Sequence, residues 1–102
     1  MRFSVIYAPE VFDDIQEAVN WYNFKQKGLG TRFFNAIKEQ IKRIKRMPSA
    51  FPVIYDDVRC AQVNIFPYMI HFRLFPEKKT IHVIAIFSTD RDPKIWKERT
   101  EK

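Results

Sequence analysis

The sequence has 102 residues, is 46% hydrophobic and contains a single cysteine, Cys60. It is long enough for one core in a single domain, residues 1–102, and its composition excludes a disordered or disulfide-stapled chain. The net charge of +6, from 18 Lys+Arg and 12 Asp+Glu, favours acidic partners, either nucleic acid or an acidic protein segment. No window approaches the roughly 18 apolar residues of a membrane span. We therefore expect a soluble, cytoplasmic protein without a membrane contact.

The N-terminal half predicts one strand and two helices. Residues 2–7 alternate in character as a strand does, and residues 10–25 carry apolar side chains at helical spacing, with Gly28 as a stop. A second helix is expected from Thr31 to before Pro48. The short linker makes the two helices an antiparallel pair. The expected buried stripe of the second helix consists of Phe33, Phe34, Ile37, Ile41 and Ile44.

The C-terminal half predicts strands and a short final helix. Residues 48–58 read as a loop with a short strand at residues 53–55, and residues 59–65 alternate as a strand. Residues 66–74 and 81–87 form a hairpin joined by residues 75–80. Asp92 is the expected N-cap of the final helix, with Pro93 in its first turn. The fold class is therefore α+β: an N-terminal strand, a helical hairpin, a three-stranded antiparallel meander and a short C-terminal helix.

Few residues point to catalysis or to a metal. His71 and His82 lie on neighbouring strands without a partner at metal-ligand spacing, so we expect no metal and a structural role for both. The sequence has no nucleophile motif and no glycine loop for phosphate, so we expect no cofactor. The second helix carries a basic stripe, which fits a solvated face better than a phosphate track. Its members are Arg32, Lys38, Lys42, Arg43, Lys45 and Arg46.

Two short motifs flank the hairpin: Phe66-Pro67-Tyr68 precedes it, and Arg91-Asp92-Pro93 with Trp96 follows it. With the order of strands and helices, they make the whole chain resemble the ParE/RelE superfamily of small bacterial toxins, and specifically its ParE (plasmid stabilisation) branch. Trp96 has two readings: it fastens the final helix to the sheet, or it forms part of a contact surface.

The resemblance implies the toxin of a type II toxin–antitoxin system. RelE-like members are ribosome-dependent mRNA endonucleases, but this chain has Met69 where they carry an arginine and Trp96 near the place of a catalytic tyrosine. The ParE branch also lacks the nuclease residues, and its characterised members inhibit DNA gyrase. The resemblance thus favours gyrase inhibition by contact, with no catalytic residue. The expected contact residues are Arg59, Arg73, Arg91, Asp92 and Trp96.

The resemblance also implies a cognate antitoxin that neutralises the toxin. Its acidic C-terminal segment would lay a helix on the helical hairpin and add a strand at a sheet edge, and the toxin would meet DNA only through the antitoxin. Two alternatives remain: a RelE-type mRNA endonuclease whose catalytic residues have moved, and a degenerate toxin that only binds its antitoxin.

Overall fold

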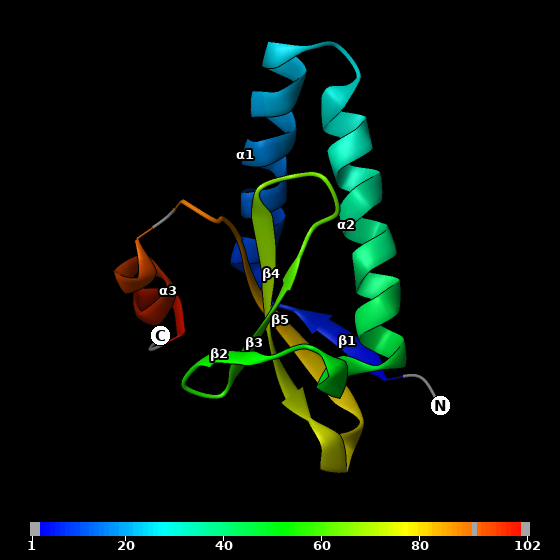
Figure 1. Cartoon of the computed structure of the whole chain (residues 1–102), viewed down its shortest axis with the longest axis vertical. Coiled ribbons are helices and arrows are strands. Elements are labelled where there is room, and N and C mark those ends of the chain that lie inside the picture. Colours follow the sequence, from blue (N-terminus) through cyan, green and yellow to red (C-terminus); the bar gives the residue numbers. More distant parts are fainter. Residues whose placement is uncertain (1–2, 91, 101–102) are drawn as a thin grey trace.

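The structure is a computed structural model that describes residues 3–90 and 92–100. Figure 1 shows two long helices side by side, standing over one sheet. The helices are α1 (Pro9–Lys25), α2 (Leu29–Arg46) and α3 (Pro93–Thr100), with short 3-10 turns η1 (Pro48–Ala50) and η2 (Pro76–Lys78). The strands are β1 (Ser4–Tyr7), β2 (Val53–Tyr55), β3 (Val58–Gln62), β4 (Tyr68–Phe75) and β5 (Thr80–Ser88).

The sheet has the strand order β1-β5-β4-β3-β2. β4 and β5 pair over their whole length, from Tyr68 opposite Ser88 to Phe75 opposite Thr80. β1 runs parallel to β5, and the other pairs are antiparallel. The predicted meander and the α+β class are confirmed, and the short strand expected at residues 53–55 forms the far edge of the sheet.

The element bounds differ from the predicted ones by a few residues. The second helix begins at Leu29 rather than Thr31, directly after Gly28, whose φ of +86° turns the chain between the helices. The strand predicted for residues 59–65 covers Val58–Gln62. The chain then enters the loop to β4, in which Ile65 has a φ of +76°, outside the range of a β-strand.

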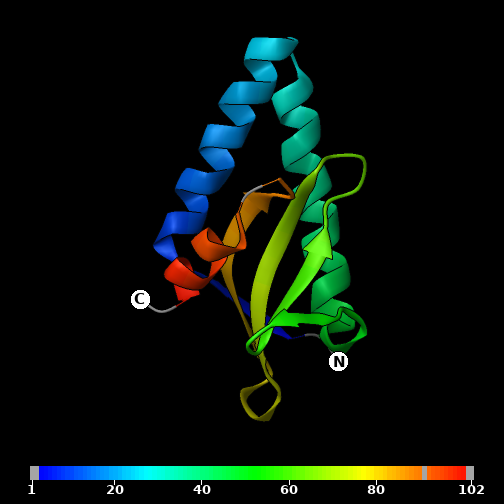
Figure 2. The ribbon, with the colours of Figure 1, turned by 60° about the vertical axis from the view of Figure 1, so that its left-hand side comes forward.

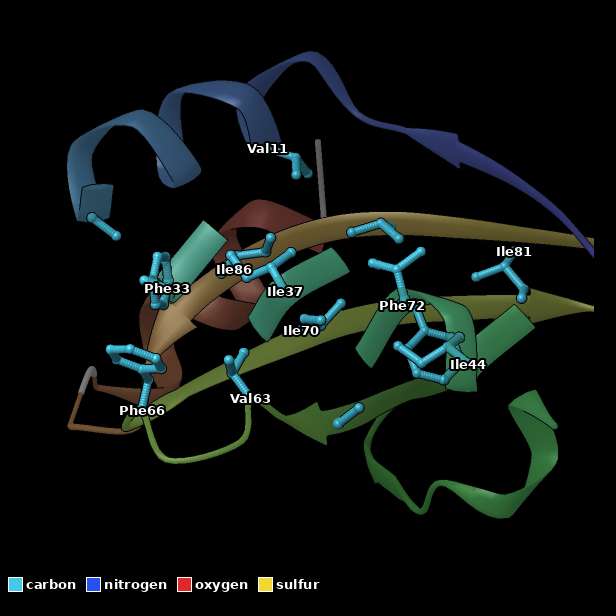
Figure 3. Close-up of a cluster of buried hydrophobic side chains, with 14 residues drawn as sticks. Val11, Phe33, Ile37, Ile44, Val63, Phe66, Ile70, Phe72, Ile81 and Ile86 are labelled. Atoms are coloured by element: carbon cyan, nitrogen blue, oxygen red, sulfur yellow. The ribbon is translucent and has the colours of Figure 1, made fainter. Parts of the chain in front are cut away.

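The core lies between the helical hairpin and one face of the sheet (Figure 3). Phe33 and Ile44 of α2 pack here with Phe72 of β4, and all three side chains are fully buried. One predicted core residue is wrong: the side chain of Phe34 is 42% exposed. A helix turns by about 100° per residue, so Phe34 points away from the sheet to the outer side of the hairpin.

Four aromatic rings pack together at the end of the core that lies next to the β3–β4 loop. The ring of Phe33 lies 4.9 Å from that of Tyr68 and 5.2 Å from that of Phe66, and Tyr22 contacts Phe66 at 5.0 Å. Such edge-on pairs each stabilise a fold by about 0.5–1.5 kcal/mol beyond their buried area. The Phe-Pro-Tyr motif therefore has a structural role, because both of its rings join the hairpin to the sheet.

Gly30 sets how closely α1 and α2 approach each other. A Cβ at this residue would lie 2.5 Å from the Val19 carbonyl oxygen and 2.7 Å from the Asn23 side chain, which accepts a hydrogen bond from the Gly30 N–H at 2.8 Å. We expect Gly30→Ala to lower the free energy of unfolding by about 1–3 kcal/mol in urea denaturation, because the helices must separate. Gly28→Asn is the control: it meets open space, and asparagine tolerates positive φ. Equal stability of the two variants would contradict the close approach.

Candidate functional site

The second face of the sheet is covered by α3 rather than by the hairpin (Figure 2). The Trp96 ring lies 5.0 Å from the His71 ring and 5.6 Å from the Tyr55 ring. Asp92 begins the helix by accepting a hydrogen bond from the Lys94 N–H at 2.9 Å, which confirms the predicted N-cap. Trp96 therefore fastens α3 to the sheet, the first of its two predicted readings.

A bidentate ion pair holds the end of α3 against α1. Both Nη atoms of Arg99 donate to the Asp14 carboxylate at 3.0 Å, and Nη1 also donates to the Ile84 carbonyl at 3.2 Å. The Ile86 N–H donates to the same carboxylate at 3.0 Å. These side chains provide hydrogen-bond partners for backbone groups of β5 beyond Val83. The groups would otherwise lie on an open edge of the sheet, because β1 ends at Tyr7.

The Asp14–Arg99 ion pair, which joins α3 to α1, is a contact that the sequence analysis did not predict. Its side chains are only 12% and 18% exposed, and the hydrogen bond with Asp14 raises the pKa of Arg99. Asp14 lies in the first helix, where its position indicates no distant partner. No local pattern links two residues that are 85 positions apart.

Beneath Trp96, His71 forms the centre of a small buried polar cluster. Its Nδ1 lies 3.0 Å from the Tyr55 hydroxyl and 3.4 Å from the Cys60 sulfur. Burial, with a smaller contribution from Arg99, lowers the pKa of His71 to about 4. Burial also raises the pKa of the Cys60 thiol to about 12 and raises the pKa of Tyr55. Burial thus favours the uncharged form of each of the three groups. With Trp96 packed on the rings of His71 and Tyr55, they hold α3 against the sheet.

The predicted contact residues do not lie on one face. Arg59 pairs with Phe72 in the sheet register, which places it on the core side, and its Nη1 donates to the Phe51 carbonyl at 2.7 Å. Arg73 pairs with Val58 on the opposite face, beside Cys60 and His71 in the alternation, and its Nε donates to Asp57 at 2.8 Å. Arg73, Asp92 and Trp96 thus lie on the α3 side of the sheet. Arg91 lies outside the described residues.

A groove runs along the outer side of the helical hairpin. This α1–α2 groove encloses about 540 Å³. Its floor is apolar and its rim basic: the Lys38 amine lies 5.5 Å from the centre of the Phe34 ring, in reach of a cation–π contact. The lining consists of Tyr7, Phe12, Ile15, Gln16, Phe34, Ile37, Lys38, Ile41, Lys42 and Lys45.

The groove matches the chemistry of an amphipathic helix with acidic flanks. Exposed Phe12 and Phe34, at 59% and 42%, would cover the apolar side of such a helix, and the lysines would meet its carboxylates. The resemblance predicted a helix on the helical hairpin, but the sequence analysis missed the groove and its residues because it assigned Phe34 to the core and the lysines to a solvated face. The signal in the sequence that could have revealed the groove was the aromatic side chain of Phe34 close to the lysines of the second helix.

Within residues 3–90 and 92–100, no group of three or more His, Cys, Asp or Glu side chains is placed to hold a metal ion. None of the described helices is both long enough and apolar enough to span a bilayer. The candidate functional surfaces are the α1–α2 groove, the α3 side of the sheet and the basic flanks of α2.

Solved structures with the same fold are bacterial toxins and toxin–antitoxin complexes. The chromosomal ParDE toxin–antitoxin system of P. aeruginosa superposes with a TM-score of 0.74 at 18% identity, covering 85% of this chain and 96% of that one. A mutant of the E. coli toxin RelE in the free state gives 0.73 at 12% identity, covering 99% and 97%. The RelBE2 complex of Mycobacterium tuberculosis gives 0.64 at 15% identity, covering 86% and 99%.

No protein-family model matches the sequence, and neither does any curated protein. The resemblance to the ParE/RelE superfamily is thus confirmed in the fold, at identities where fold and function are separate questions.

The buried His71 predicts a specific acid sensitivity. Its pKa of about 4 in the folded chain lies below the ordinary value of 6.5, so the unfolded chain binds more protons between these values. The free energy of unfolding should therefore fall as the pH drops from 6.5 to 4, with His71 contributing up to about 3 kcal/mol. Urea denaturation at each pH measures this dependence.

The matched variants are His71→Gln and His82→Gln. The first removes the titrating ring from the cluster, so the pH dependence between 6.5 and 4 should become shallower than in the wild type. The second retains His71 and should keep the wild-type slope. Parallel curves for His71→Gln and the wild type would contradict the buried neutral histidine, whatever the absolute stability of the variant.

Proposed function

We propose that this chain, which has the fold of the ParE and RelE toxins, is the toxin of a type II toxin–antitoxin pair in the bacterial cytoplasm. The observation that carries the proposal is the α1–α2 groove. Its apolar floor and lysine rim suit the acidic, amphipathic segment with which an antitoxin would cover the helical hairpin. The net charge of +6 would speed the encounter of the two proteins.

The proposed target is DNA gyrase, which the toxin would inhibit by contact and so block replication. The chemistry of the sheet supports contact over RNA cleavage. His71 and Tyr55, the groups on the α3 face best suited to proton transfer, bond to each other beneath Trp96. Met69 occupies the strand position where RelE-like chains carry an arginine. Arg59, Arg73, Arg91, Asp92 and Trp96 remain the proposed contact residues, and DNA would be bound only through the antitoxin.

The second candidate is an mRNA endonuclease of RelE type, because the fold is shared with RelE. Induction of the chain by itself in a bacterial host distinguishes the two. We expect thymidine incorporation to fall within the first minutes while methionine incorporation continues, because a gyrase poison stops replication before translation. A prior fall in methionine incorporation would replace the gyrase proposal with the endonuclease. Growth without arrest would favour a degenerate toxin that binds only its antitoxin.

The groove itself is tested with the antitoxin. Its gene is expected as a neighbouring open reading frame for a short acidic protein with a DNA-binding N-terminal half. We expect Phe34→Glu to weaken antitoxin binding by about 30-fold or more, because it places a carboxylate in the apolar floor. In cells, the variant should arrest growth even when the antitoxin is co-expressed.

Phe24→Glu is the matched control. It makes the same change on the same hairpin at a side chain that is 83% exposed and does not line the groove. Isothermal titration of the purified proteins gives both affinities. If the antitoxin binds Phe34→Glu as tightly as the control, it covers another surface and the groove assignment is wrong.

A further inference from the structure

Ile65 combines strain with exposure. Its φ is +76°, a left-handed conformation that a β-branched residue rarely adopts, and its side chain is 80% exposed. Two other described non-glycine residues have positive φ, Asp56 and Lys79, at 48° and 49°. Neither of them is β-branched. The side chain of Ile65 therefore contributes little to the core while its backbone opposes the fold.

The loop around Ile65 is held from both ends. On one side, the Val63 N–H donates to the Tyr68 carbonyl at 2.8 Å, and the buried Gln40 side chain donates to the Gln62 carbonyl at 2.9 Å. On the other side, the buried Phe66 ring packs on Phe33. Such surroundings can maintain a strained residue, and residues of this kind cluster at functional sites. These contacts hold the loop in place while the Ile65 side chain remains exposed to solvent.

Two arginines of α2 line a hollow beside this side chain. This hollow of about 320 Å³ lies between the loop and α2 and includes Arg32, Arg43, Ile65 and Glu39 in its lining. A second hollow of about 330 Å³ continues along α2 and is lined by Arg43, Arg46, Met47, Ala50 and Phe51. Arg43 lines both, so they form one strip, in which Ile65 and Met47 are the exposed apolar side chains, at 80% and 64%.

The strip is separate from the α1–α2 groove. At 100° per residue, Arg32, Arg43 and Arg46 form one row on α2, and Lys38, Lys42 and Lys45 form another, centred about 105° away around the helix axis. The two hollows of the strip share no lining residue with the groove. A partner in the groove would therefore leave the strip accessible.

We propose that Ile65 and the arginine row form a further protein-binding surface, with which the toxin binds its target protein in addition to the contact residues proposed above. The inference rests on the proposed function and assigns the target a chemistry: an apolar pocket for Ile65, rimmed by carboxylates for Arg32 and Arg43. A protein fits better than a nucleic acid, because bases stack on aromatic rings and the exposed apolar side chains here are aliphatic. Arginine and methionine are both enriched at protein interfaces.

Ile65→Gly separates strain from function in one variant. Glycine adopts φ of +76° without a steric penalty, so the melting temperature should rise by about 2–5 °C. The same change deletes the side chain that enters the pocket, so growth arrest should require about 30-fold more toxin or be lost. Antitoxin affinity should stay at the wild-type value. A variant that is more stable yet inactive distinguishes loss of contact from loss of folding.

Two controls accompany it. Lys79→Gly introduces glycine at the other end of the sheet, at a residue that also has positive φ, and should retain full arrest. Arg32→Glu reverses a charge in the strip and should weaken arrest, whereas Lys78→Glu makes the same change in net charge on the distant β4–β5 turn and should not. Cellular toxin levels are matched by immunoblot.

The outcomes separate this inference from the function on which it rests. Full arrest by Ile65→Gly overturns the strip while leaving the toxin proposal intact. Full arrest by Ile65→Gly with loss of arrest in Arg32→Glu indicates a phosphate-bearing ligand and also overturns the protein pocket. Loss of antitoxin binding by Ile65→Gly would assign the strip to the antitoxin instead. A wild-type chain that never arrests growth overturns the proposed function and this surface together.

Discussion

The need to cover both faces and the exposed edge of β5 determines how the rest of the molecule is arranged. β5 has a strand on each side, β1 and β4, and buried residues on both faces: Val83 and Ile86 face the hairpin, and Ala85 and Phe87 face α3. A strand this apolar needs cover on both faces. β1 ends opposite Val83, so the remaining edge of β5 needs partners of another kind. Asp14 and Arg99 provide them, and by doing so they fix α1 and α3 to the same strand.

This cover has a chemical consequence. The helix that protects the second face of the sheet covers the buried His71 and Cys60 and part of Tyr55. Burial lowers the pKa of His71 and raises that of Cys60, which favours the uncharged form of each side chain. With Trp96 packed on the rings of His71 and Tyr55, the cluster holds α3 against the sheet.

α2 shows how one helix serves several surfaces. Its apolar stripe, with Phe33 and Ile44, builds the core. Lysines on one flank border the groove with the exposed Phe34, and arginines on the other flank border the strip with Ile65. The difference in chemistry between the flanks is physically meaningful, because arginine forms planar, bidentate contacts whereas lysine acts as a flexible point charge.

Sequence patterns predicted the class of the fold, the elements to within a few residues and the cap at Asp92, because alternation, helical spacing and capping depend on neighbours within a few residues. Motifs such as Phe66-Pro67-Tyr68 also indicated the shared fold. The outward orientation of Phe34, the placement of Arg59 and Arg73 on opposite faces and the strain at Ile65 became visible only in the folded chain. Asp14 bonds to partners 72 and 85 residues away, and contacts at such separations leave no periodic trace in a sequence because they arise only when the folded chain brings distant segments together.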